Sequence, residues 1–274
     1  MYSIPDPGST ENVSDWAEFY LASQKEELSR AELSSFIEGS SGSEPPDEFI
    51  NSVWLELESR EVLYGENPPY CVQRGLLQPN IAWEEYPEYM TCLIFALEGN
   101  PVESLKSGVL FERITNEAVR SFLGGESIVV GFPNIKEVVD IATALGEKFA
   151  SDPPWYRQDR DLDVVAWKPF GDQRASQVII LIQSAAGHNW TEKKPVSLDA
   201  WRKYVHFACK PIKGFAIPVI ISDKVKLEDV STDLGLIIDR ARIYRNMIKS
   251  ALKDSSLRED LKEWCTDRLE AMES

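Results

Sequence analysis

The strongest constraint on the fold comes from two neighbouring segments with strand-like patterns, residues 162–167 and 178–185. In the first, side chains alternate so that Asp161 and Asp163 lie on one side of the strand and an apolar row lies on the other. In the second, Gln183 shares one face with apolar residues near the end of the run. A connection rich in turn-forming residues joins them, so the two segments are predicted to run side by side in one sheet.

The segments around this pair alternate between helical and strand-like patterns. Residues 110–123 have an apolar stripe at helical spacing, and two glycines end that stripe. The other predicted elements are a strand at 128–131, helices at 138–149 and 198–207, a strand at 216–221, and C-terminal helices at 234–252 and 257–271. This alternation predicts an α/β domain with a mixed central sheet over residues 106–274.

Residues 1–105 have a different character. The first twelve residues are rich in Pro, Gly and Ser and are predicted to be disordered, and 15–38, 49–63 and 86–98 have helical spacing. No repeat or chemical motif occurs here. We therefore expect a mostly helical N-terminal region that serves as an interaction module.

The formal net charge of −16 constrains the partners of the chain. Proteins that bind duplex DNA usually carry a basic surface, so this charge argues against a strong lone DNA binder and leaves a local basic surface as the route to DNA. Basic residues gather late in the chain, in 201–204 and in 239–245. The second run either contacts phosphates or forms a solvated face with internal ion pairs.

The four cysteines and two histidines are widely spaced, with no metal-ligand spacing among them. We expect buried or half-buried free thiols and no histidine-based catalysis. No apolar run is long enough to span a bilayer, and the N-terminus lacks the pattern of a secretory signal. The expectation is a cytoplasmic protein without a membrane partner.

Three short motifs resemble the PD-(D/E)xK nuclease superfamily, which has the restriction-endonuclease-like fold. They are Phe111-Glu112 on a helix, Asp161-Leu-Asp-Val-Val-Ala on one strand, and Val178-Ile-Ile-Leu-Ile-Gln-Ser-Ala on the next. A Gln replaces the usual second acidic residue, as in the branch of restriction enzymes that act on modified DNA. The resemblance covers residues 110–190, under a third of the chain.

The resemblance implies a site for Mg²⁺ or Mn²⁺ that hydrolyses phosphodiester bonds. Asp163 would be the main metal ligand, Gln183 a weaker neutral ligand, and Glu112 a holder of metal-bound water or of a second ion. The lysine that normally follows two residues after the Glu or Gln is Ala185 here. Lys193, or the adjacent Lys194, is the expected substitute.

Each of these residues also has an ordinary structural interpretation. Asp161 and Asp163 can be turn and strand-edge residues, and Gln183 can satisfy backbone groups. Glu112 and Glu117 can be solvated flanks of their helix, which is the favoured interpretation for Glu117.

The downstream segments 187–193 and 215–218, together with Trp201, are similar to uncharacterised bacterial proteins of this fold that are associated with phage defence. The first hypothesis is therefore a metal-dependent DNA endonuclease of a bacterial anti-phage defence system. It would have a protein partner such as a helicase, an ATPase or another defence subunit. The alternative is a catalytically inactive nuclease-fold scaffold subunit of a defence complex, which Ala185 and the acidic charge favour. A third hypothesis, an acidic DNA mimic, leaves the paired strands unexplained.

Overall fold

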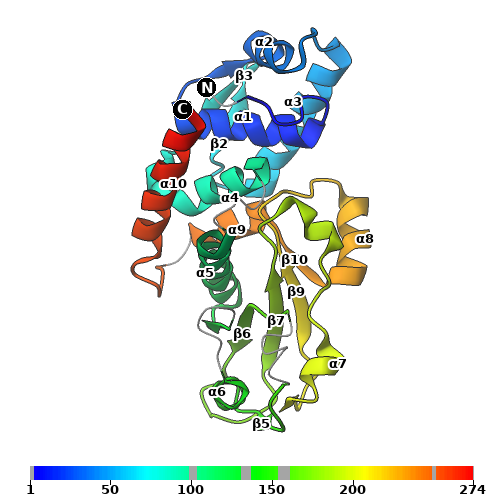
Figure 1. Cartoon of the computed structure of the whole chain (residues 1–274), viewed down its shortest axis with the longest axis vertical. Helices are drawn as coiled ribbons and strands as arrows, with labels where there is room; N and C mark the ends of the chain where they lie inside the picture. Colours follow the sequence, from blue (N-terminus) through cyan, green and yellow to red (C-terminus); the bar gives the residue numbers. More distant parts are fainter. Residues whose placement is uncertain (1–2, 99–103, 131–136, 154–160, 249–250, 274) are drawn as a thin grey trace.

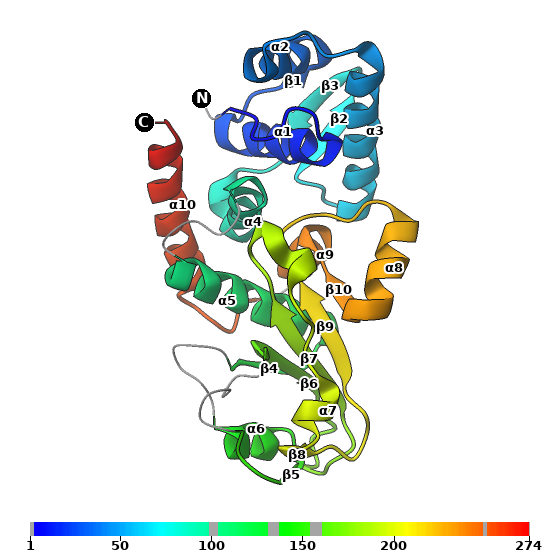
Figure 2. The same ribbon diagram turned by 45° about the vertical axis from the view of Figure 1, so that its right-hand side comes forward.

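The structure is a computed structural model that describes residues 3–98, 104–130, 137–153, 161–248 and 251–273. Figures 1 and 2 show a helical lobe, formed mainly by N-terminal elements, stacked on a lobe built around a β-sheet. The C-terminal helix returns along the helical lobe (Figure 1). No helix in these described ranges combines the length and the apolar character that a membrane crossing requires.

The helical lobe is built from the first hundred residues. Its elements are α1 (Thr10–Gln24), β1 (Leu28–Ser29), α2 (Arg30–Ser41), α3 (Asp47–Tyr64), β2 (Tyr70–Gln73), β3 (Leu76–Pro79), η1 (Trp83–Glu85) and α4 (Pro87–Glu98). The Ser9 side chain caps α1, and the reciprocal bonds of Ser29 and Glu32 start α2. The prediction of disorder over residues 1–12 is wrong from residue 3 onward, because Ile4 is buried and α1 begins at Thr10.

The second lobe contains the longest helix and the largest sheet. Its elements, with the C-terminal helix, are α5 (Ser104–Leu123), β4 (Glu126–Val129), α6 (Val138–Ala144), β5 (Lys148–Phe149), β6 (Val164–Lys168), β7 (Val178–Ser184), η2 (His188–Glu192), α7 (Leu198–Trp201), β8 (Val205–His206), β9 (Ile212–Ala216), α8 (Lys224–Leu234), β10 (Leu236–Ile238), α9 (Arg240–Met247) and α10 (Leu257–Glu273). Gly125 ends the turn after α5, where a Cβ would overlap the carbonyl oxygen of Trp167.

The main sheet has five strands in the order β10-β9-β7-β6-β4. β4, β6 and β7 pair antiparallel, whereas β7, β9 and β10 pair parallel. Ile180 and Ile182 of β7 join the core cluster that contains α5, and Ile179 and Leu181 join a second cluster with α6 and α7. Helices therefore cover both faces, and the predicted α/β architecture with a mixed sheet is confirmed.

Several predicted boundaries differ from the structure. The helix predicted at 138–149 ends at Ala144 and is followed by β5, and the one predicted at 198–207 ends at Trp201 before β8. The strand predicted at 216–221 lies earlier, as β9. Residue 131 of the strand predicted at 128–131 lies outside the described residues.

The predicted helix 234–252 is wrong over its first residues. Gly235 has a φ of 88° and ends the helical conformation after α8. The sequence analysis did not predict this break. Residues 236–238 then pair with β9 as β10. Their apolar run is compatible with helix or strand, and only the neighbouring strand decides between them.

The two lobes meet at a buried charge cluster, called here the inter-lobe cluster. It consists of Asp15 and Glu18 from α1, Arg60 and Tyr64 from α3, and Arg240 from α9. The two guanidinium groups each contact both carboxylates, at 2.6 and 3.0 Å for Arg60 and at 2.7 and 3.0 Å for Arg240. Tyr64 donates to Glu18 and accepts from Arg240 Nε at 3.0 Å. Charges so fully buried require this degree of pairing.

Further contacts join residues of the two predicted domains, 1–105 and 106–274. The main apolar cluster contains Trp16, Phe111 and Trp264, which come from both of them. α10 joins the helical lobe through ion pairs such as Arg268 with Glu98 at 2.6 Å. The domain boundary itself stays a prediction.

Candidate active site

Polar side chains surround a hollow at the end of the sheet where β6 begins and β7 ends. Its volume is about 240 Å³, and we call it the β6–β7 hollow. It is lined by Gly108, Phe111, Glu112, Asp161, Asp163, Gln183, Ser184, Ala186 and Lys193. The fold thus brings together Glu112, Asp163, Gln183 and Lys193. Glu112 comes from α5 and Lys193 from the segment after η2, so these two residues lie far apart in the sequence.

Asp163 lies directly before β6 and is held by both neighbouring strands. Its backbone N–H donates to the carbonyl oxygen of Ile182 at 3.0 Å, and its carbonyl oxygen accepts from Val130 at 2.8 Å. Its Oδ2 accepts a hydrogen bond from the backbone N–H of Ser184 at 2.6 Å. The strand ladder therefore fixes the direction of this half-buried carboxylate, and a backbone donor stabilises its charge.

Gln183 and Ser184 are the last two residues of β7. Gln183 is only 8% exposed. Within the described residues, neither its Oε1 nor the Oγ of Ser184 has a hydrogen-bond partner. Leaving a buried acceptor unpaired costs roughly 1–3 kcal/mol, so an oxygen of this kind beside a hollow suits a donor or a cation from outside the chain.

The other predicted residues reach the hollow from three directions. Glu112 is half-buried on α5, and the half-buried Lys193 follows η2, where its N–H donates to the carbonyl oxygen of Trp190 at 3.2 Å. Asp161 is exposed and has a φ of 60°. The alternation predicted to include Asp161 therefore starts only after it, but the residue still lines the hollow.

Ala185, the position expected to hold the lysine, belongs to the apolar core. It is fully buried in a cluster with Trp190, Phe215 and Ile217, and its N–H donates to Ala216 at 2.9 Å. It does not line the hollow, whereas its neighbours Ser184 and Ala186 do.

The carboxylates at the hollow do not form a closed metal cage within the described residues. Across the described ranges, no group of three or more His, Cys, Asp or Glu side chains is arranged to hold a metal ion. Mg²⁺ nevertheless needs only one or two carboxylates, because it retains several waters. Asp163 and the amide oxygen of Gln183, with Glu112 in the lining of the same hollow, fit an ion held in this way.

Two other sequence interpretations change. Glu117 is not a solvated flank: it is buried, binds Arg120 at 2.8 Å, and accepts hydrogen bonds from the backbone N–H groups of Lys253 and Asp254. The basic run 239–245 divides, because Arg240 is buried in the inter-lobe cluster whereas the two later arginines are exposed.

Sequence reasoning also missed three residues that line the hollow, namely Ser184, Ala186 and Gly108. For Ser184 a signal existed, since it adjoins Gln183 at a strand end; for Gly108, which depends on where α5 crosses the sheet, there was none.

The thiols follow the expected pattern with one exception. Cys92 and Cys265 are buried, Cys71 is half-buried, and Cys209 is exposed. Burial raises the pKa of both Cys92 and Cys265 to about 12, so these thiols stay protonated at neutral pH. They are core residues rather than reactive groups.

No protein-family model matches the chain, and no curated protein is similar to it at a significant level. Among solved structures, the restriction endonuclease FokI is similar over 87% of this chain and 44% of its own, with 8% identity and a TM-score of 0.23. The chain thus spans less than half of that structure, and at this TM-score the likeness carries no argument about fold or function.

Proposed function

We propose that the chain is a metal-dependent DNA endonuclease with a restriction-endonuclease-like core, which hydrolyses phosphodiester bonds at the β6–β7 hollow. The observation that carries this proposal is the gathering of Glu112, Asp163, Gln183 and Lys193 around one hollow. These residues come from separate elements, and Asp163 and Gln183 lie where β6 begins and its antiparallel neighbour β7 ends. Glu112, Asp163 and Gln183 are also part of the short sequence motifs that resemble PD-(D/E)xK nucleases.

Each residue has a distinct role in this proposal. Asp163 is the main ligand of Mg²⁺ or Mn²⁺, Gln183 contributes its amide oxygen, and Glu112 orients a metal-bound water or a second ion. When bound, the ion neutralises charge on the phosphate and lowers the pKa of water. Lys193 replaces the missing lysine at Ala185 by reaching back from the segment after η2, and it holds or moves a proton of the attacking water.

The first experiment measures cleavage of DNA by the full chain with Mg²⁺ or Mn²⁺. Asp163→Ala is expected to lower the rate by about a thousandfold or more, because the ion loses its main ligand. Asp199→Ala is the matched control, since Asp199 is exposed on α7 and lies outside the hollow. Cleavage that survives Asp163→Ala would falsify the site.

A second pair of variants tests the migrated lysine. Lys193→Met should lower the rate by about a hundredfold and change its pH profile, as expected for loss of a group that handles a proton. Lys194→Met is the control, because Lys194 is its exposed neighbour and does not line the hollow. Equal effects of the two substitutions would remove Lys193 from the mechanism.

The biological setting is part of the proposal and rests on the resemblance alone. We place the nuclease in a bacterial anti-phage defence system, acting on DNA through a local basic surface with a helicase, ATPase or other defence subunit. The test is cleavage with and without the product of a neighbouring gene. No stimulation by any neighbour would argue against a partner-dependent role.

Two observations favour the alternative, a catalytically inactive scaffold subunit. Ala185 is packed into the core, and the described residues hold no cluster of three metal-binding side chains. A scaffold would bind no divalent ion more tightly than millimolar and cleave nothing, alone or with partners. Calorimetric detection of a tight Mn²⁺ site that Asp163→Asn abolishes would reject this alternative.

A further inference from the structure

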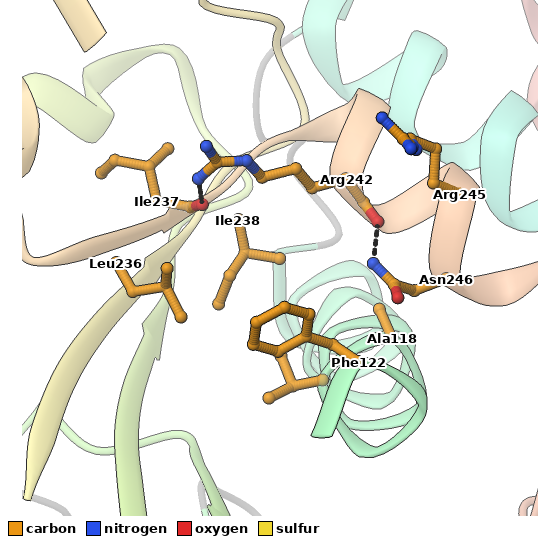
Figure 3. Close-up of a pocket in the computed structure, with 9 residues that line it drawn as sticks. Ala118, Phe122, Leu236, Ile237, Ile238, Arg242, Arg245 and Asn246 are labelled. Carbon is orange, nitrogen blue, oxygen red and sulfur yellow. Dashed lines mark hydrogen bonds between the residues drawn. The ribbon is translucent and has the colours of Figure 1, made fainter. Parts of the chain in front are cut away.

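A second, larger hollow lies away from the strand ends, between α5, β10 and α9 (Figure 3). We call it the β10 hollow. Its volume is about 420 Å³, within the range of small-molecule sites. It is lined by Ala118, Val119, Phe122, Leu236, Ile237, Ile238, Arg242, Arg245 and Asn246. No residue is shared with the β6–β7 hollow.

The floor of the β10 hollow is apolar and includes an exposed aromatic ring. Leu236 and Ile238 come from β10, an edge strand of the main sheet, and Phe122 comes from the last turn of α5. Phe122 is 56% exposed, which leaves one of the larger apolar side chains of the molecule in contact with solvent. Figure 3 shows its ring beside Leu236 and Ile238. An apolar floor with an open ring suits a planar group.

Two arginines of α9 form the rim. Arg242 and Arg245 are three residues apart, which places them on one side of the helix. Both are exposed, and within the described part of the chain neither makes an ion pair with a carboxylate. Their positive charge is therefore available to an anion from outside the chain.

Local contacts hold both arginines in position. Arg242 Nη1 donates to the carbonyl oxygen of Ile237 at 2.5 Å, and Asn246 Nδ2 donates to the carbonyl oxygen of Arg242 at 2.7 Å (Figure 3). Arg245 packs over Gly65, where a Cβ would lie only 3.2 Å from its Nε. The guanidinium groups are thus oriented before any ligand arrives, which lowers the entropy lost on binding.

We propose that the β10 hollow binds a nucleotide, with the base against Phe122 and the apolar floor and the phosphate between Arg242 and Arg245. Guanidinium groups match phosphate oxygens in a planar, two-point geometry, and bases stack on exposed aromatic rings. The nucleotide is either free in solution or one unit of a DNA strand, and both sources offer the same base and phosphate. The site does not depend on catalysis at Asp163.

The test titrates the full chain with adenosine 5′-monophosphate, adenosine and inorganic phosphate, using calorimetry. Saturable binding is expected for the monophosphate, at least about tenfold tighter than for adenosine or phosphate alone, because only the monophosphate engages both floor and rim. A single-stranded DNA 12-mer is the second arm. If the natural source is a strand, the 12-mer binds more tightly than the monophosphate and competes with it; if it is the free nucleotide, the order reverses.

Variants assign the binding to this hollow. Phe122→Ala and Arg245→Gln should each weaken monophosphate binding about tenfold. Phe170→Ala and Arg202→Gln are matched controls, since both residues are exposed and lie outside the hollow, and they should leave binding unchanged. Asp163→Ala should also leave it unchanged, which separates this proposal from the nuclease. Absence of binding, or binding that Phe122→Ala and Arg245→Gln do not weaken, would overturn the proposal.

Discussion

The inter-lobe cluster is a fully buried group of polar side chains and the β6–β7 hollow a partly buried one, and the polar atoms of the two groups are hydrogen-bonded to very different extents. In the cluster, each guanidinium contacts two carboxylates, and Glu18 also accepts from Tyr64 and from Tyr89. At the hollow, the amide oxygen of Gln183 and the hydroxyl of Ser184 lack partners within the described residues.

The difference separates architecture from candidate function. A buried polar group that is fully paired inside the chain holds elements in place and has little capacity left for a ligand. A buried polar group left unpaired costs stability, which a fold tolerates where the atom serves another molecule. On this ground the hollow, rather than the more highly charged cluster, is the candidate site.

The largest expected effect on stability comes from breaking the cluster. Arg240→Met leaves Asp15 and Glu18 with a single cation, and loss of one partner from a buried pair costs about 3–5 kcal/mol. Urea unfolding measures this change, with Arg242→Met, two residues along the same helix, as the exposed control. A loss below about 1 kcal/mol would mean that the cluster does not hold the lobes together.

Alkaline pH should destabilise the protein through three buried tyrosines, of which Tyr64 belongs to the cluster and Tyr89 donates a hydrogen bond to its Glu18. Burial raises the pKa of Tyr64, Tyr70 and Tyr89 well above the usual 10. Because the folded pKa exceeds the unfolded one, the contribution to stability is complete below pH 10 and is lost as pH rises, by about 1 kcal/mol per pH unit for each tyrosine. Tyrosinate absorbance should appear together with unfolding; ionisation of these three in the folded protein would contradict the prediction.

Acid should act on the cluster through Asp15. Burial tends to raise the pKa of Asp15, but Arg240 and Arg60 outweigh it and hold the pKa below the usual 3.8. Because the folded pKa is lower than the unfolded one, the ionised carboxylate contributes to stability at pH values above the unfolded pKa. This contribution is lost as pH falls towards the folded pKa. Stability should therefore be insensitive to this group at neutral pH and decline below about pH 4. Asp15→Asn removes that contribution, so the free energy of unfolding of this variant should fall less steeply below about pH 4. The same dependence on acid pH in the variant and in the unchanged protein would contradict the prediction.

Placing a lysine at position 185 should damage the fold without raising the rate of cleavage. Ala185→Lys puts a long charged side chain into the cluster of Trp190, Phe215 and Ile217, at a cost of about 3 kcal/mol. Ala186→Lys is the comparison variant. Ala186 lines the hollow, so the amine of the introduced lysine can remain hydrated there. Cleavage gained by Ala185→Lys with unchanged stability would mean that position 185 reaches the site.

The smallest expected change in stability is at Gln183. Gln183→Leu removes the unpaired amide oxygen and should leave stability unchanged or raise it by up to about 1 kcal/mol, while it weakens Mn²⁺ binding. Urea unfolding and calorimetry measure the two effects on one variant. Marked destabilisation would show that the amide is paired in solution and serves the fold.

The sequence predicted elements best where a local pattern was unambiguous. The amphipathic stripe of α5 and the apolar runs of β6 and β7 were found, because periodicity depends on which face is buried. β10 was missed, since three apolar residues between helices become a strand only when β9 lies alongside. The prediction that Glu117 is solvated was wrong for a similar reason, because its hydrogen-bond partners, Lys253 and Asp254, lie far along the chain.

For the site, the sequence by itself determined which side chains are able to bind a cation, and it placed Asp163 and Gln183 on two neighbouring strands. Alternation and strand pairing are local, so they can be read from residue order. The tertiary structure decided the rest. It placed Glu112 and Lys193 at the same hollow, packed Ala185 into the core, and left the amide oxygen of Gln183 without a hydrogen-bond partner among the described residues. These outcomes depend on which surfaces meet when distant segments pack, and residue order alone does not specify them.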